Sequence, residues 1–326
     1  SSDVCSSDLN DELNIKDITE KSVDFIVITH PDQDHTIGIK KVLENFSVKK
    51  IYMNRPWKYV DDLFDKINDG RITKESLARR LREKYKTIAD IEDMAKEKNI
   101  PIYEAFEGTH IEDELLILSP EKQYYLSLLV SSEKTPLEMS SALQHDGTLL
   151  KFLESVKDFA LNILETWDIE TLRESETTSA ENETSVILRG KVDGSGFILT
   201  GDAGIGSLNR AIDYMEKIGE NIVEDISFYQ VPHHGGRHNV SPSVLNRMLG
   251  EKIEKGSSRN KVAFASVAQN SSHPLKMVTN AYIRRGVTIY KTNGNVICHH
   301  NGKMPDRRWV GLKSIEFSDY VEEWSN

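Results

Sequence analysis

The chain contains almost no cysteine, since Cys5 and Cys298 are the only two in 326 residues. They lie far apart and lack partners at metal-ligand spacing, which excludes a disulfide framework and a zinc-finger module. No run of 18 apolar residues occurs, so a membrane-spanning helix is not expected. No charged and then apolar leader with a small-residue cleavage site opens the sequence. These absences predict a soluble, cytoplasmic protein whose metal ligands are histidine and aspartate.

Positive charge is also scarce, because 41 Lys and Arg face 52 Asp and Glu for a formal net charge of −11. This balance argues against a protein that wraps nucleic acid over its whole surface, although it permits local basic patches. The most basic window is 71–86, with seven Lys or Arg against Glu75 and Glu83. On a helix such a run is usually a solvated face, so contact with a polyanion is the less favoured interpretation.

The hydrophobic pattern alternates between strands and helices along most of the chain. Short β-branched runs predict strands, and periodicity of about 3.6 residues predicts helices between them. The expected strands are 23–29, 50–53, 100–105, 115–118, 185–189, 197–200, 226–231, 262–267, 287–290 and 296–299. The expected helices are 36–46, 205–218, 241–248 and 275–285, and helical spacing also covers 57–99 and 121–171. Such alternation favours a layered α/β fold.

Three segments interrupt this pattern. Residues 121–183 are expected to form a helical insertion, which ends in a polar surface loop at 174–183 with the sequence ESETTSAENE. Residues 1–20 are interpreted as a non-native or partial N-terminus, because SSDVCSSDLN lacks periodicity, and opening strands of the fold would then be missing. The main domain is expected over 21–315, followed by a C-terminal tail over 316–326.

Histidine and aspartate gather directly after the expected strand 23–29. His30, Asp32, Asp34 and His35 lie within six residues there. A loop after a strand lets closely spaced side chains converge on an ion, whereas neighbours along a strand point to opposite faces. The plain alternative for this segment is a solvated loop.

Three later strand ends deliver the same residue types. Asp202 follows 197–200 in the sequence TGD, the pair His233 and His234 follows 226–231 in the sequence HHGG, and His273 stands in SHP after 262–267. Each of these residues taken alone is weak evidence for a metal site. Asp202 could cap the next helix, the paired histidines could pack beside glycine, and His273 could be an ordinary loop residue. Their common placement favours one site. The other histidines are interpreted as structural or surface residues: His110, His145, His238, His299 and His300.

The order HxDxDH, TGD, HHG and SHP resembles the metallo-β-lactamase superfamily, and within it the ComEC-like branch, over roughly residues 21–290. The resemblance implies a four-layered αββα sandwich and two divalent metal ions. Asp32 stands where the superfamily's common motif HxHxDH has histidine; this harder donor makes manganese as plausible as zinc. The superfamily's usual metal-binding histidine ahead of the TGD strand is missing, because 181–185 contains none.

Counting donors completes the expected site. With Asp202 bridging two ions and two ligands of the HxDxDH motif on each, each ion still needs one protein ligand. We assign His233 to the first ion and His273 to the second, and leave His234 to contact the substrate or leaving group; spacing does not decide between His233 and His234. Asp34 is expected both to bind metal and to orient a metal-activated hydroxide. The full set of expected ligands is His30, Asp32, Asp34, His35, Asp202, His233 and His273.

The resulting prediction is a metal-dependent hydrolase of phosphodiester bonds, nuclease-like, with DNA or RNA as its substrate. Only the window 71–86 and Arg237 offer local positive charge for nucleic acid. One alternative is a hydrolase of a small phosphoester or lactone, which needs a closed pocket formed with the helical insertion. Another is a non-catalytic binding module on the same scaffold.

Overall fold

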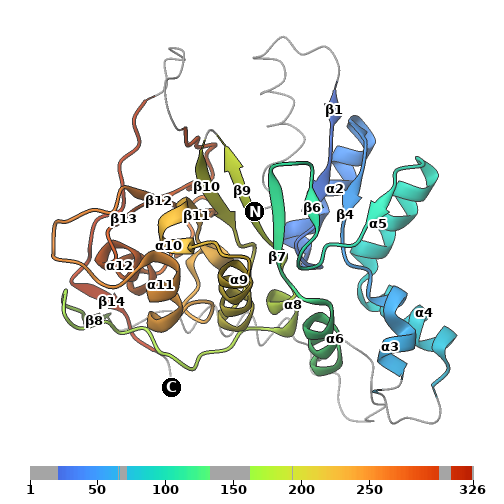
Figure 1. Ribbon diagram of the computed structural model, residues 1–326, viewed down its shortest axis with the longest axis horizontal. Coiled ribbons are helices and arrows are strands. Elements are labelled where there is room, and N and C mark those ends of the chain that lie inside the picture. The colour runs from blue at the N-terminus through green and yellow to red at the C-terminus, as the bar shows by residue number, and fades with distance from the viewer. Residues whose placement is uncertain are drawn as a thin grey trace.

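The largest sheet among the described residues runs in the order β13-β12-β11-β10-β9-β7-β6. The computed structural model, shown in Figure 1, describes residues 21–64, 66, 72–132, 162–192, 194–300 and 310–324. The strands are β6 (His110–Ile111), β7 (Leu115–Ser119), β9 (Ile187–Val192), β10 (Ser195–Leu199), β11 (Ile226–Gln230), β12 (Lys261–Ala265) and β13 (Val287–Lys291). Strands β10 to β13 pair in parallel, whereas β6, β7, β9 and β10 pair antiparallel.

The smaller sheet is parallel and contains β2 (Ile26–Val27), β4 (Ile51–Tyr52) and β5 (Ile102–Tyr103). The parallel pair β1 (Ser22–Val23) and β3 (Ser47–Val48) extends the β2/β4 ladder, because Ile26 N–H donates to Lys50 O and Lys49 N–H donates to Val23 O. Apolar side chains between the sheets form a buried cluster of Tyr52, Ala105, Ile111, Ile117, Val186 and Leu188. The two sheets therefore pack against each other through an apolar interface.

Helices cover the outer faces of both sheets (Figure 1). Helices α9 (Ile205–Lys217), α10 (Ile222–Asp225), α11 (Pro242–Leu249) and α12 (Lys276–Arg284) bury their apolar sides with the larger sheet. The smaller sheet packs with α2 (Gln33–Asn45), α3 (Val60–Phe64), α4 (Lys74–Lys84), α5 (Lys86–Glu97), α6 (Lys122–Ser131) and the 3-10 helix η1 (Pro56–Tyr59). This arrangement confirms the expected αββα sandwich. No helix among the described residues is long and apolar enough to span a bilayer.

The expected helix over 121–171 is only partly correct. Helix α6 lies at its start, but Ile163 and Leu164 belong to strand β8 (Asn162–Leu164), which pairs antiparallel with β14 (Tyr320–Glu322). The helical spacing at 163–164 was misleading because a partner strand from the far end of the chain covers this segment. Residues 133–161 lie outside the described part, as do 1–20.

Two shorter expectations are also wrong. Residues 296–299 form no strand. The polar segment 174–183 is not wholly a surface loop, since its last residues form α8 (Ala180–Glu183), where Glu181 and Asn182 are 5% and 4% exposed. Composition made this segment look solvated, but Glu181 accepts hydrogen bonds from the buried side chains of Ser132 and Tyr85.

A fully buried ion pair fixes the segment after β8 to α12. Glu165 and Arg284 are both 0% exposed, and Arg284 Nη1 lies 2.7 Å from Glu165 Oε1. Asn280 Nδ2 donates to the same oxygen at 2.9 Å, and Arg284 Nε donates to Trp167 O at 2.8 Å. Removal of one member leaves the other charge unpaired in the core, which lowers the free energy of unfolding by about 3–5 kcal/mol.

We therefore expect Glu165→Ala to lower the free energy of unfolding by about 3–5 kcal/mol in denaturant titrations. The matched control is Glu316→Ala, which removes an exposed carboxylate that pairs with Lys313 at 3.0 Å. That control should change stability by less than about 1 kcal/mol. Equal effects of the two substitutions would contradict the structural role of the buried pair.

Candidate metal centre

Loops from both sheets bring most of the expected site residues together. His30 follows β2, and Asp34 and His35 begin α2. Asp202 lies between β10 and α9, and the paired histidines lie in the 3-10 helix η2 (Pro232–Gly235) after β11. The loops meet because Val186 N–H donates to Thr29 O at 3.0 Å and His233 N–H donates to Gly201 O at 3.1 Å.

Asp202 lies at the centre of the group and is 4% exposed. Its Oδ1 is 3.2 Å from His35 Nε2, and its Oδ2 is 3.6 Å both from His30 Nε2 and from His233 Nδ1. The two carboxylate oxygens thus face two different sets of imidazole nitrogens. A carboxylate placed in this way can hold a cation on each side.

Four side chains could hold an ion, because their donor atoms all lie within 4.8 Å of one another: Asp34, His35, Asp202 and His234. His234 Nε2 is 3.4 Å from Asp34 Oδ2. His234, which the sequence assigned to the substrate, thus lies among the converging donors. His233 faces the other side of Asp202, together with His30.

The two remaining expected ligands lie at the edges of this arrangement. Asp32 is the N-cap residue of α2, with Oδ2 3.9 Å from His30 Nε2. His273 lies between β12 and α12, where its backbone N–H donates to Ser271 Oγ at 3.1 Å. It is not among the four converging residues, so its role as a ligand stays a prediction.

Neighbouring polar groups orient the imidazoles. His234 Nδ1 is 2.6 Å from Ser266 O; because a carbonyl only accepts, Nδ1 must carry a proton, and Nε2 is the nitrogen that faces Asp34 and the centre. His30 Nδ1 lies 3.1 Å from Thr29 Oγ1. Orientation of this kind fixes which nitrogen faces an ion.

Asn182 is a site residue that the sequence did not predict. Its Nδ2 lies 2.7 Å from His233 Nδ1, and it also donates to Thr178 Oγ1 at 2.7 Å. It lies in the segment 181–185, where the resemblance to the superfamily leads one to expect a metal-binding histidine. A polar residue just ahead of an apolar strand was the available signal.

The turn that carries both histidines has an unusual backbone. His233 and His234 have φ values of 46° and 58°, followed by Gly235 at 91°. The left-handed region costs a non-glycine residue roughly 1–2 kcal/mol, and such residues often cluster at functional sites. Asn239 Nδ2 supports the neighbouring loop by donating to Asp202 O at 2.9 Å.

Burial and the close charges shift the protonation of the site. Burial lowers the pKa of His30 to about 4, and the neighbouring His35 adds to this effect, so His30 is neutral near pH 7, as a metal ligand must be. Burial alone would raise the pKa of Asp202, but the close imidazoles, His35 foremost and then His30 and His233, outweigh it and hold that pKa well below its usual range. The hydrogen bond from His234 lowers the pKa of Asp34 to about 2, and the same contact raises the pKa of His234.

The donor atoms fit a divalent cation. Nε2 of His30 and Nε2 of His35 are buried and lack a hydrogen-bond partner among the described residues, yet both face Asp202. A buried polar atom without a partner costs about 1–3 kcal/mol, which a cation between nitrogen and carboxylate would remove. Imidazole and carboxylate ligands together suit zinc and manganese.

One comparison with known families supports this interpretation. Residues 5–101 match the family model described as Metallo-beta-lactamase superfamily. The match is shorter than a third of the 326 residues, and it contains the segment with His30, Asp32, Asp34 and His35. The superfamily consists mostly of metal-dependent hydrolases. No curated protein matches the chain.

The central place of Asp202 predicts that Asp202→Ala lowers the zinc or manganese bound per chain, because each half of the centre loses a carboxylate oxygen. Metal content after dialysis, measured by plasma mass spectrometry, checks this. Asp213→Ala is the control, since Asp213 is an exposed carboxylate on α9 that pairs with Arg247 at 2.7 Å. Unchanged metal content in the Asp202 variant would contradict the assignment.

Gly235 should be irreplaceable for steric reasons. A Cβ there would lie 2.4 Å from Pro274 Cβ, whereas a Cβ at Gly219, with φ 81°, meets nothing within 4 Å. We expect Gly235→Ala to destabilise the fold and lower metal affinity, because the turn that carries His233 must shift. Gly219→Ala should cost only about 1–2 kcal/mol from its backbone. Calorimetric unfolding and metal titration separate the two, and equal losses would refute the steric argument.

Proposed function

We propose that this chain hydrolyses phosphodiester bonds with two divalent cations, held on either side of Asp202. The observation that carries the proposal is the division of the Asp202 oxygens between His35 and the pair His30 and His233. Bound cations at such a site lower the pKa of water and neutralise the charge that develops on phosphoryl oxygens. Metal-dependent hydrolysis, the general class of reaction to which this activity belongs, is the activity of most of the matched superfamily.

The choice of a phosphodiester rests on the chemistry of the ligands. Asp32 and Asp34 place two carboxylates at the more exposed edge of the centre, with side chains 32% and 52% exposed. Carboxylates are harder donors than imidazoles and suit manganese as well as zinc. The motif order also resembles the ComEC-like, nuclease-like branch, which supports the same class of bond.

His234 and Asp34 are the residues that we assign to proton transfer. The Asp34 contact raises the pKa of His234, and a protonated imidazole cannot bind a cation. This favours the interpretation that His234 holds a proton at Nε2 and donates it to the leaving oxygen. Asp34 accepts that hydrogen bond and orients the ring toward the centre.

Nucleic acid, the substrate expected from the sequence, has weaker support. On α4, Arg82 contacts the carboxylates of Glu92 and Asp93, and its guanidinium lies 4.8 Å from the centre of the Trp57 ring. Arg237 donates to Glu323 O at 2.8 Å and packs against Trp324. Because Arg82 and Arg237 are engaged within the chain, we favour a small phosphodiester over a polymer.

The proposal predicts turnover of bis(p-nitrophenyl) phosphate by protein loaded with Mn²⁺ or Zn²⁺, and loss of turnover after EDTA. His234→Gln should lower kcat by about 10²–10⁴-fold, as expected for removal of a general acid. The control His238→Gln changes an exposed histidine whose Nδ1 is 2.8 Å from Glu176 Oε2, and it should leave kcat unchanged.

Single-stranded DNA and RNA complete the substrate panel. Cleavage of either polymer at a higher kcat/KM than the small diester would restore the nuclease interpretation. If the metal-loaded protein turns over no phosphodiester at all, the proposed function is wrong.

A further inference from the structure

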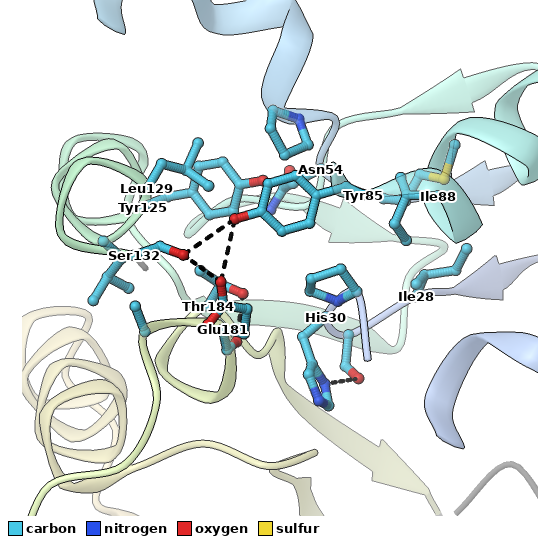
Figure 2. Close-up of a pocket in the computed structure, with 16 residues that line it drawn as sticks. Ile28, His30, Asn54, Tyr85, Ile88, Tyr125, Leu129, Ser132, Glu181 and Thr184 are labelled. Atoms are coloured by element: carbon cyan, nitrogen blue, oxygen red, sulfur yellow. Dashed lines mark hydrogen bonds between the residues drawn. The ribbon is translucent and has the colours of Figure 1, made fainter. Parts of the chain in front are cut away.

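A pocket lies against the metal centre, and the proposed chemistry does not use it (Figure 2). Its walls come from the loop with His30, from the start of α5 and from α6 and α8. Its lining includes His30, Tyr85, Tyr125, Leu129, Ser132 and Glu181. We call it the Glu181 pocket. In Figure 2 the hydroxyls of Tyr85 and Ser132 both point toward Glu181.

Glu181 is a buried carboxylate that pairs with no cation among the residues that the structure describes. Within the described residues it accepts hydrogen bonds from Ser132 Oγ and, at 3.3 Å, from Tyr85 OH, and both bonds end on Oε1. No Lys or Arg is among the described residues that line the pocket, and none of them forms an ion pair with Glu181. Neutral hydroxyls solvate a carboxylate only partly, and buried charges in proteins are normally paired.

Most of the remaining wall of the pocket is aromatic or aliphatic. Tyr85 and Tyr125 contribute two rings, and Leu128 and Leu129 of α6 contribute aliphatic wall. The negative faces of aromatic rings attract cations, and a single acidic group in an apolar pocket fixes the orientation of a ligand. This combination suits an ammonium group on a short carbon chain.

The pocket and the metal centre share structural elements. His30 lines the pocket and also places Nε2 3.6 Å from Asp202 Oδ2. Asn182, which follows Glu181 on α8, contacts His233. A ligand held by Glu181 therefore lies beside the reacting centre.

We propose that the Glu181 pocket binds a primary ammonium group on the non-reacting arm of the substrate. The identity of this ligand as a substrate arm rests on the proposed phosphodiesterase function, whereas binding of an ammonium group does not. The two parts are tested by separate measurements.

Binding is measured with n-propylammonium and its neutral counterpart n-propanol on the metal-loaded full chain at pH 7, by ligand-detected NMR titration. The wild type should bind the cation more tightly than the alcohol. Glu181→Gln should raise the Kd for n-propylammonium about tenfold and leave the Kd for n-propanol unchanged. The control Glu112→Gln alters an exposed carboxylate that pairs with Lys50, and it should have no effect.

A second variant guards against a general loss of structure. Ser132→Ala removes one donor from Glu181 Oε1, so the carboxylate gains from a charged ligand, and the Kd for n-propylammonium should fall or stay equal. A higher Kd in Glu181→Gln without a higher Kd in Ser132→Ala would not arise from misfolding. Equal affinity of n-propylammonium for wild type and Glu181→Gln, or weaker binding by both variants, would overturn the proposal.

Kinetics then tests the substrate arm. Two p-nitrophenyl phosphodiesters are compared, one with a 3-aminopropyl arm and one with an n-butyl arm. The wild type should prefer the ammonium arm by about tenfold in kcat/KM, and Glu181→Gln should abolish this preference. Equal turnover of both diesters refutes the substrate arm. No turnover of either refutes the proposed function, while the binding result stands independently.

Discussion

The contact between the Asp202 carboxylate and three imidazoles is the interaction on which the site depends. A buried carboxylate is costly unless positive or hydrogen-bonding groups compensate it, and His35 compensates it strongly enough to hold its pKa well below the usual range. Burial keeps His30 neutral beside it. The centre therefore combines a charged acceptor with the neutral imidazole of His30, the protonation state in which a histidine binds a divalent cation.

The sandwich brings two loops from different sheets to one carboxylate, that of Asp202. Thr29 O accepts from Val186 N–H, which ties the end of β2 to the larger sheet. Gln230 Oε1 accepts from the backbone N–H of Thr200 and of Gly201, and so fixes the loop that leads to Asp202. A Cβ on Gly201 would approach Thr29 to 3.2 Å, so the close packing of these loops leaves little space for larger residues.

Much of this could be predicted from the sequence, because strand ends are visible in a hydrophobic pattern. The segment from His30 to His35 and the position of Asp202 follow from apolar runs that stop at polar residues. The roles of the two adjacent histidines could not be predicted. Which side of Asp202 each one faces depends on positive φ values at both, and on a carbonyl of Ser266 that lies 32 positions later in the chain. Likewise, β8 could not be recognised without β14, its distant partner.

Helix α8 explains why composition failed most clearly near the site. Its last three residues are polar, and each serves a different neighbour: Glu181 faces the pocket, Asn182 contacts His233, and Glu183 accepts from Ser207 N–H at 2.7 Å at the start of α9. Polarity normally indicates exposure, but here each polar group has a hydrogen-bond partner or a pocket supplied by tertiary structure. Local rules tend to fail where function demands buried polar groups. The failure of the surface-loop prediction at 181–183 therefore itself indicates that this turn joins the metal centre to the pocket.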